Sequence, residues 1–162
     1  MKTYVITLSR VFPAKHKRAG EPTEFEEEFL AGQDMQRVRT FVRHKKLHTI
    51  RANYALWAKR FEKIAAGDAC LSVREWMGAP YRSKQREIAR LTKDDGVGLQ
   101  QLTCLDTNAY CFYPCVRIEN RDIDKVLVAT NDGLSLDDWR EWFKKYDLTK
   151  PLAVIHFTKF RY

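Results

Sequence analysis

The chain has 162 residues, 44% of them hydrophobic and 31% charged, a composition typical of one globular domain with its own core. No run approaches the roughly 20 apolar residues that a membrane-spanning helix needs, and the first residues lack the pattern of a signal peptide. We therefore expect a single domain over residues 1–162, no membrane contact and a cytoplasmic location. The formal net charge of +8 favours polyanionic partners, since neutralising phosphates releases their counterions.

The first third of the chain predicts a strand followed by helices. Apolar and polar residues alternate over residues 4–11, before Pro13, which predicts a strand. Thr23 and Glu26 form a capping-box pattern, which predicts the start of a helix that Gly32 ends. A second helical stretch is predicted over residues 35–43, and it leads into a strand that contains Thr49.

The middle of the chain predicts a helix and a strand. Asn53 is a candidate N-cap, and three large apolar residues at helical spacing follow it: Trp57, Phe61 and Ile64. Gly67 is expected to end this helix. Residues 69–76 then predict a strand, in which Arg74 and Trp76 share one face.

The last third predicts strands over residues 97–105, 110–118, 126–130 and 151–162, with one helix that begins at the N-cap Ser135. The total is six or seven short strands and three or four helices. We therefore predict an α+β fold, a small and mostly antiparallel β-barrel with three or four peripheral helices, because closure into a barrel removes exposed strand edges.

The four cysteines do not form a strong metal-binding pattern. Cys70, Cys104, Cys111 and Cys115 contain no C-x-x-C pair, and the four-residue spacing of the last two falls in a predicted strand. We expect reduced structural thiols, no metal and no cofactor.

The segment Lys46-Leu-His-Thr-Ile-Arg51 concentrates the polar chemistry of the chain. In an extended conformation Thr49 and Arg51 share one face, and His48 and Ile50 share the other. A hydroxyl beside a guanidinium suits recognition of a phosphate, a carboxylate or a base edge. Lys46 has the wrong parity for that face and is expected to join it from the preceding loop.

Basic residues cluster at three places, 15–18, 37–46 and 82–86, with aromatic residues near them. Basic patches interleaved with aromatic side chains suit unpaired, stacked bases, whereas the alternative is a solvated basic surface. The predicted nucleic-acid interface consists of cations, aromatic residues and a hydroxyl: Lys15, Lys17, Arg18, Lys46, Thr49, Arg51, Arg74, Trp76, Tyr81 and Arg82.

The segment from Lys46 to Arg51 resembles the signature of ASCH domains, which belong to the PUA-like superfamily of small β-barrels. The order of predicted elements agrees, and residues 151–157 resemble the closing strand of that fold. The resemblance implies RNA or nucleotide binding. A bacterial branch of the family instead hydrolyses acetylated cytidine with a lysine, a threonine and a glutamate. These positions fall on Lys46, on Thr49 and near Asp132, whose side chain is one methylene shorter than glutamate.

Two functions therefore stay open for this segment. As a hydrolase, Thr49 would be the nucleophile, Lys46 its base after burial or neighbouring cations lower its pKa, and Asp132 the acid that protonates the leaving amine. As a binder, Lys46 and Arg51 would hold phosphate, Thr49 would donate a hydrogen bond, and Asp132 would only cap or turn the chain. In both cases His48, opposite Thr49, and His156 are expected to be structural.

Overall fold

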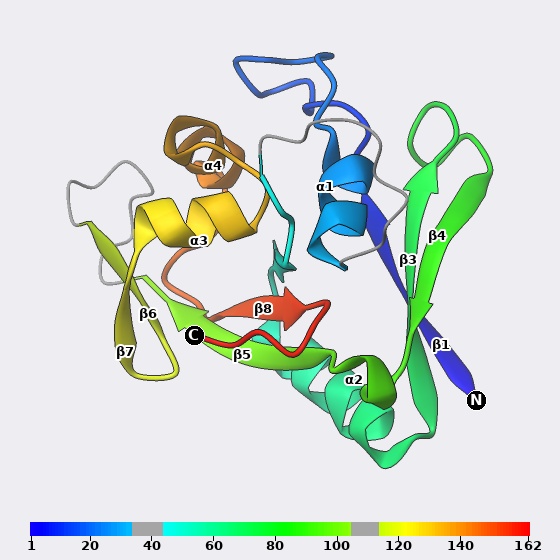
Figure 1. Ribbon diagram of the computed structural model, residues 1–162. Coiled ribbons are helices and arrows are strands. Elements are labelled where there is room, and N and C mark those ends of the chain that lie inside the picture. Colours follow the sequence, from blue (N-terminus) through cyan, green and yellow to red (C-terminus); the bar gives the residue numbers. More distant parts are fainter. Residues whose placement is uncertain (34–43, 105–113) are drawn as a thin grey trace.

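The computed structural model describes residues 1–33, 44–104 and 114–162 (Figure 1). In chain order its elements are β1 (Lys2–Leu8), α1 (Phe25–Gly32), β2 (His48–Arg51), α2 (Tyr54–Ala66), β3 (Ala69–Trp76), β4 (Gln85–Leu91), the 3₁₀ turn η1 (Lys93–Asp95), β5 (Gly98–Thr103), β6 (Cys115–Ile118), β7 (Arg121–Asp124), α3 (Lys125–Asn131), α4 (Leu136–Phe143) and β8 (Leu152–His156). The predicted helical stretch over 35–43 lies outside the described residues. So does the first part of the strand predicted over 110–118, which contains Cys111.

The described strands form two sheets. One has the order β1-β3-β4, with β1 parallel and β4 antiparallel to β3, and the other is antiparallel with the order β2-β8-β5-β6-β7. The α+β class and the mostly antiparallel pairing are therefore confirmed. Among the described residues no hydrogen-bonded ladder joins the two sheets, so closure into a barrel stays a prediction.

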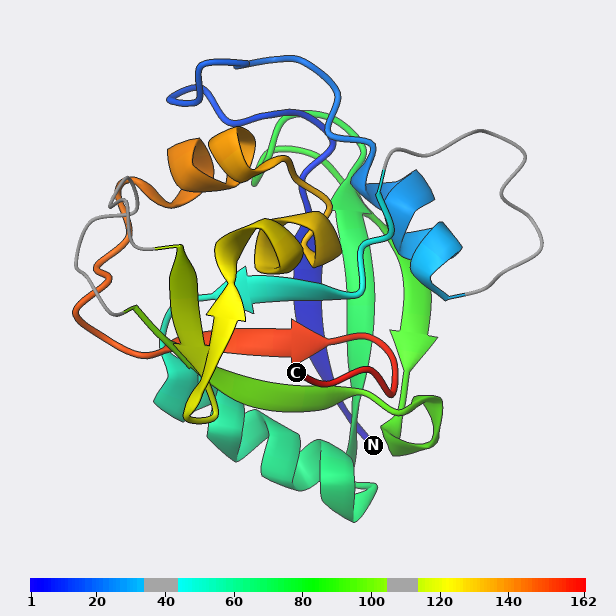
Figure 2. The ribbon, with the colours of Figure 1, turned by 60° about the vertical axis from the view of Figure 1, so that its left-hand side comes forward.

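The helices cover the sheets on different sides. Helix α2 packs against β3 and β5 and so spans both sheets, whereas α3 and α4 lie together beyond β2, on the other side of the five-stranded sheet (Figures 1 and 2). Helix α1 is docked by Phe29, whose ring meets Phe157 edge-to-face at 5.0 Å. Apolar residues of both sheets are fully buried, and each such side chain contributes about 1.5–3 kcal/mol relative to exposure.

Several local predictions are confirmed. The Asn53 side chain accepts a hydrogen bond from the backbone N–H of Leu56 and caps α2, which ends at Gly67 in the left-handed conformation. Ser135 caps α4 by accepting from the N–H of Asp138. The strand predicted over residues 69–76 is β3, and α1 ends at Gly32 as expected.

Other predictions were wrong. Residues 126–130, predicted as a strand, belong to helix α3, because the Asp124 side chain caps the N–H of Val126 and a short apolar run does not distinguish helix from strand. Thr23 is not the N-cap of α1, which is Glu24; the Thr23 hydroxyl donates to the carbonyl of Ser9 and accepts from the N–H of Phe25 at 3.4 Å. The last strand ends at His156 and not at residue 162.

Two strands were missed, β4 and β7. Their burial patterns are mostly exposed or half-buried, so neither has the apolar alternation that would have revealed it. The first strand, β1, covers residues 2–8 and is thus shifted toward the N-terminus relative to the predicted 4–11.

Replacing Asn53 tests the start of α2, which follows β2 directly. Asn53 combines a capping side chain with a positive φ of 62°. We expect Asn53→Ala to lower the free energy of unfolding by about 1–2 kcal/mol, because it loses the cap and keeps the strained backbone. Asn53→Gly, the matched control, relieves the strain and should cost only a few tenths of a kcal/mol. Chemical denaturation measures both, and equal losses would contradict this account.

Candidate functional site

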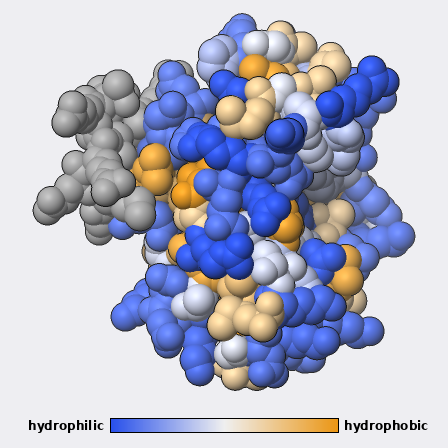
Figure 3. Space-filling view, turned by 90° about the vertical axis from the view of Figure 1, so that its right-hand side faces the viewer, coloured by the Kyte–Doolittle hydropathy of each residue, from blue (hydrophilic) through white to orange (hydrophobic). Residues whose placement is uncertain are grey.

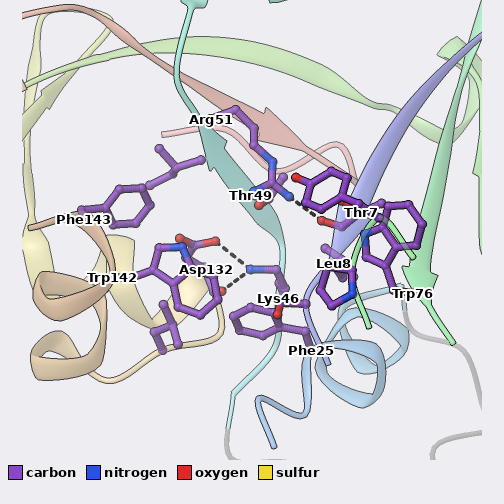
Figure 4. A pocket seen from close by; sticks show the side chains of 15 residues that line it. Thr7, Leu8, Phe25, Lys46, Thr49, Arg51, Trp76, Asp132, Trp142 and Phe143 are labelled. Carbon is purple, nitrogen blue, oxygen red and sulfur yellow. Dashed lines mark hydrogen bonds and ion pairs between the residues drawn. The ribbon is translucent and has the colours of Figure 1, made fainter. Parts of the chain in front are cut away.

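A cavity of about 260 Å³ lies between the two sheets and the ends of three helices (Figure 4). Its walls come from the end of β1, from α1, from the segment that leads into β2, from the β3–β4 connection, and from residues after α3 and in α4. Six residues that the sequence singled out line it: Lys46, Thr49, Arg51, Trp76, Tyr81 and Asp132.

The centre of the cavity is an ion pair between Lys46 and Asp132. The Lys46 ammonium donates to Asp132 Oδ1 at 2.7 Å and also to the Asp132 backbone carbonyl. Lys46 is 1% exposed and Asp132 is 3% exposed, so the pair is almost shielded from solvent. Lys46 joins the site from the loop before β2, as its parity predicted.

Backbone contacts bring these two residues together. The N–H of Lys46 donates to the carbonyl of Glu28 in α1 at 2.9 Å, and the N–H of Leu47 donates to the carbonyl of Asn131 at the end of α3 at 2.8 Å. Asp132 is the C-cap of α3, and Gly133 follows with φ 81°. A side chain at position 133 would also collide with the Glu28 carboxyl group, so this turn needs glycine.

Burial moves the pKa values of the ion pair toward the neutral forms. It lowers the pKa of Lys46 below its usual 10.5, and the charge of Arg51 acts in the same direction, while Asp132 opposes the shift. Burial likewise raises the pKa of Asp132, against the effect of Lys46. A neutral Lys46 amine is therefore easier to reach than for an exposed lysine, and only that form accepts a proton.

Thr49 and Arg51 lie beside this pair on β2. The Thr49 side chain is 4% exposed, and its hydroxyl has no hydrogen-bond partner among the described residues. Arg51 donates from Nη2 to the carbonyl of Thr7 at 2.6 Å, which fixes its guanidinium against the end of β1 (Figure 4). Both residues line the cavity and His48 does not, as strand alternation predicts. Ile50, which alternation puts on the other face, also borders the cavity.

Aromatic side chains form the remaining walls. The Phe25 ring lies 4.0 Å from the Lys46 ammonium, a cation–π contact that partly compensates its burial. Trp76 and Tyr81 form another part of the wall, and their ring centroids are 5.3 Å apart. Trp142 and Phe143 of α4 also contribute.

Five predicted interface residues lie outside the cavity: Lys15, Lys17, Arg18, Arg74 and Arg82. Arg18 and Lys17 instead form ion pairs with Asp138, at 2.7 and 3.7 Å. Arg74 donates to Ser72 Oγ at 2.8 Å and lies 3.7 Å from Glu87. On the side of the β1-β3-β4 sheet, hydrophilic residues dominate the surface (Figure 3). Arg74 therefore does not line the cavity that Trp76 lines, and its place in a nucleic-acid interface stays a prediction.

Glu28 is a buried acid beside the site that sequence reasoning missed. Its side chain is 2% exposed, and Oε2 has no hydrogen-bond partner. Burial raises its pKa to about 8, although the charge of Lys46 opposes this. In the sequence, Glu28 was only a residue of the predicted helix that ends at Gly32. That pattern indicates a helix and not a site.

Among the described residues, no three His, Cys, Asp or Glu side chains are close enough to hold a metal ion, and no helix is long and apolar enough to cross a membrane. Within the described ranges, Cys70, Cys104 and Cys115 form no disulfide with one another. No protein-family model, curated protein or solved structure matches this chain. The site is therefore interpreted from its own geometry.

Glu28 makes stability depend on pH in a defined direction. Its pKa is about 8 in the folded chain and near 4.5 when exposed, so between these values the folded state alone keeps the proton. Stability from this group is complete below pH 4.5 and is lost as pH rises through 8. We compare the free energy of unfolding of Glu28→Gln with that of the unmodified chain at each pH. We expect this difference to favour the variant more at pH 9 than at pH 5, by up to a few kcal/mol.

Denaturation of both proteins at pH 5 and pH 9 measures this difference. Glu27→Gln is the matched control, because Glu27 is the exposed neighbour of Glu28 in the same helix. The same pH response in the two variants would contradict the assignment to Glu28.

Proposed function

We propose that this chain hydrolyses the amide bond of an acylated nucleoside, with acetylated cytidine as the model substrate. One observation carries the proposal: the buried pair of Lys46 and Asp132 lies in the same cavity as the hydroxyl of Thr49. A threonine needs a neighbouring base to act as a nucleophile, and a lysine with a lowered pKa is one.

The proposed reaction has two steps, the formation of a Thr49 ester and its hydrolysis, and Lys46 acts as the base in both. Thr49 Oγ1 attacks the acyl carbonyl while the neutral Lys46 amine accepts the hydroxyl proton. The C–N bond then breaks, and the amino group of the nucleobase leaves with a proton from the Lys46–Asp132 pair. Water attacks the resulting Thr49 ester, again with Lys46 as base, and releases the carboxylic acid. The sum is amide plus water to amine plus acid.

The cavity is small for a ligand site. Its volume of about 260 Å³ lies below the roughly 300–1,000 Å³ of sites for drug-sized molecules. A base carrying an acyl group would lie against the aromatic rings, and its sugar would remain at the mouth. Arg51, held by the carbonyl of Thr7, keeps further N–H donors for a carbonyl oxygen.

The resemblance to ASCH domains, with a PUA-like barrel, is part of this proposal. Support comes from the meeting of Lys46, Thr49 and Arg51, three polar residues of the signature, with Asp132, near which the resemblance implies the family's acid. The shorter side chain of Asp132 is compensated by its place at the end of α3, where its backbone carbonyl also contacts Lys46.

Incubation with acetylcytidine tests the hydrolase directly. We expect release of cytidine and acetate, and at least a 100-fold loss in kcat/KM for Thr49→Ala and for Lys46→Met. Asp132→Asn should lower kcat more than it raises KM. The exposed controls Lys63→Met and Thr149→Ala should retain full activity. Because burial lowers the pKa of Lys46, kcat/KM should rise with pH and level off below 10.5. No release above background would contradict the proposal.

Recognition of an unpaired base in RNA is the second candidate. It is favoured by Tyr81, which lines the cavity and yet is 89% exposed, in a position to stack on a neighbouring base. The net charge of +8 would supply the electrostatic part of binding.

Binding of labelled single-stranded RNA at increasing salt tests this second function. We expect affinity to fall steeply with salt, and Tyr81→Ala to weaken binding by about 5- to 100-fold, the effect of losing one stacked base. The control Arg121→Ala removes an exposed cation of β7 outside the cavity and should have a small effect. Equal effects would indicate a diffuse basic surface.

A further inference from the structure

A chain of buried polar groups leads from Asp132 away from the cavity. His48 lies on β2, opposite Thr49, and is fully buried. Its Nε2 atom lies 2.7 Å from the Tyr162 hydroxyl. The Asn131 amide nitrogen donates to the same hydroxyl at 3.1 Å. Asn131 directly precedes Asp132, so this chain of contacts begins and ends at the C-terminus of α3.

These contacts define which nitrogen of His48 carries its proton. Because the Asn131 amide donates to the Tyr162 oxygen, the Tyr162 hydrogen is available for His48 Nε2, which then accepts. Burial and the charge of Lys46 lower the pKa of His48, so the ring is neutral. A neutral imidazole has one N–H, and with Tyr162 as the donor to Nε2 this N–H lies on Nδ1.

The Nδ1 atom faces the ion pair of the site. It lies 4.0 Å from Asp132 Oδ1 and has no hydrogen-bond partner in the part of the chain that the structure describes. The same Oδ1 accepts from Lys46 at 2.7 Å, so this oxygen lies between the two side chains. An N–H directed at a carboxylate is attractive, whereas a nitrogen lone pair in that place would be repulsive, which favours the same tautomer independently.

We propose that His48 is a positioning residue for Asp132: locked by Tyr162 in the Nδ1–H form, it provides the second donor to the carboxylate when Lys46 gives up its proton. The inference rests on the proposed function for its role in turnover. When Lys46 becomes neutral, the buried Asp132 carboxylate loses its closest charged partner, which is costly, and another N–H donor reduces that cost. His48 therefore makes the neutral amine of Lys46 easier to form.

Other titratable groups around His48 and Asp132 do not replace this donor. The titratable ones are Glu28 of α1, Lys46 before β2, Arg51 of β2, His156 of β8 and Tyr162 after β8. The indole of Trp139 in α4 also favours the Asp132 carboxylate, but it is not titratable. Glu28 and His156 have pKa values that favour their neutral forms, and Tyr162 already donates to His48. Arg51 is held by the carbonyl of Thr7.

The tautomer is measured by long-range ¹H–¹⁵N NMR of the imidazole nitrogens. In the unmodified chain we expect His48 to show a protonated Nδ1 and an unprotonated Nε2 from pH 5 to pH 9. Tyr162→Phe removes the hydroxyl and should introduce the Nε2–H form. A protonated Nε2 in the unmodified chain overturns the proposal, and this measurement requires no enzymatic activity.

The effect on Lys46 is measured by its titration, followed by the ¹³Cε chemical shift. His48→Leu removes the donor and should raise the pKa of Lys46 by about one unit, about tenfold in the proton equilibrium. His48→Asn should restore much of the original value, because its amide nitrogen can take the place of Nδ1. The control His156→Leu removes the other buried imidazole of the β2–β8 pair and should leave the titration unchanged.

The two proposals fail separately. An unchanged Lys46 titration in a folded His48→Leu overturns the role of His48, whether or not the chain hydrolyses acetylcytidine. If hydrolysis is found, the rising limb of kcat/KM should move to higher pH by the same unit in His48→Leu and return in His48→Asn. If His48→Leu does not fold, the tautomer in the unmodified chain and in Tyr162→Phe still decides.

Discussion

The contact between Lys46 and Asp132 is the constraint on which the arrangement of this molecule depends. Removing two charges from water is costly, and only close pairing with additional hydrogen bonds compensates for it. Here the loop before β2 is tied to α1 through Glu28 and to α3 through Asn131, so the backbone fixes the distance between the charges. Helices α1 and α3 and strand β2 are thereby positioned by one buried pair.

The cavity around that pair has two chemically different sides. Lys46, Thr49, Arg51 and Asp132 form a polar side from β2 and the end of α3, and aromatic rings from the other elements form the rest. Such a division suits a flat ligand that has one reactive polar edge. The low polarity of the aromatic side also explains why the pKa values of the pair move toward neutrality.

The polar side of the site was predictable from the sequence, because strand alternation relates Thr49 to Arg51 and a short loop carries Lys46. The acid was only approximately predictable, since Asp132 lies 86 residues from Lys46 and α3 had been interpreted as a strand. The aromatic side was not predictable: Phe25 and Trp142 have the spacing of core residues, and only tertiary packing opens a cavity beside them. Exposed strands such as β4 lack any periodic signal.

The facing histidines of β2 and β8 have a consequence for the conditions that the chain tolerates. His48 pairs with His156 across these strands, and burial lowers the pKa of His156 to about 3. An unfolded chain would take up protons on these rings near pH 6.5, so acidification between pH 6.5 and pH 3 favours unfolding. The strand that carries Thr49 and Arg51 is one side of this pair. Protonation of these two rings would therefore destabilise the strand pair that presents Thr49 and Arg51 to the cavity.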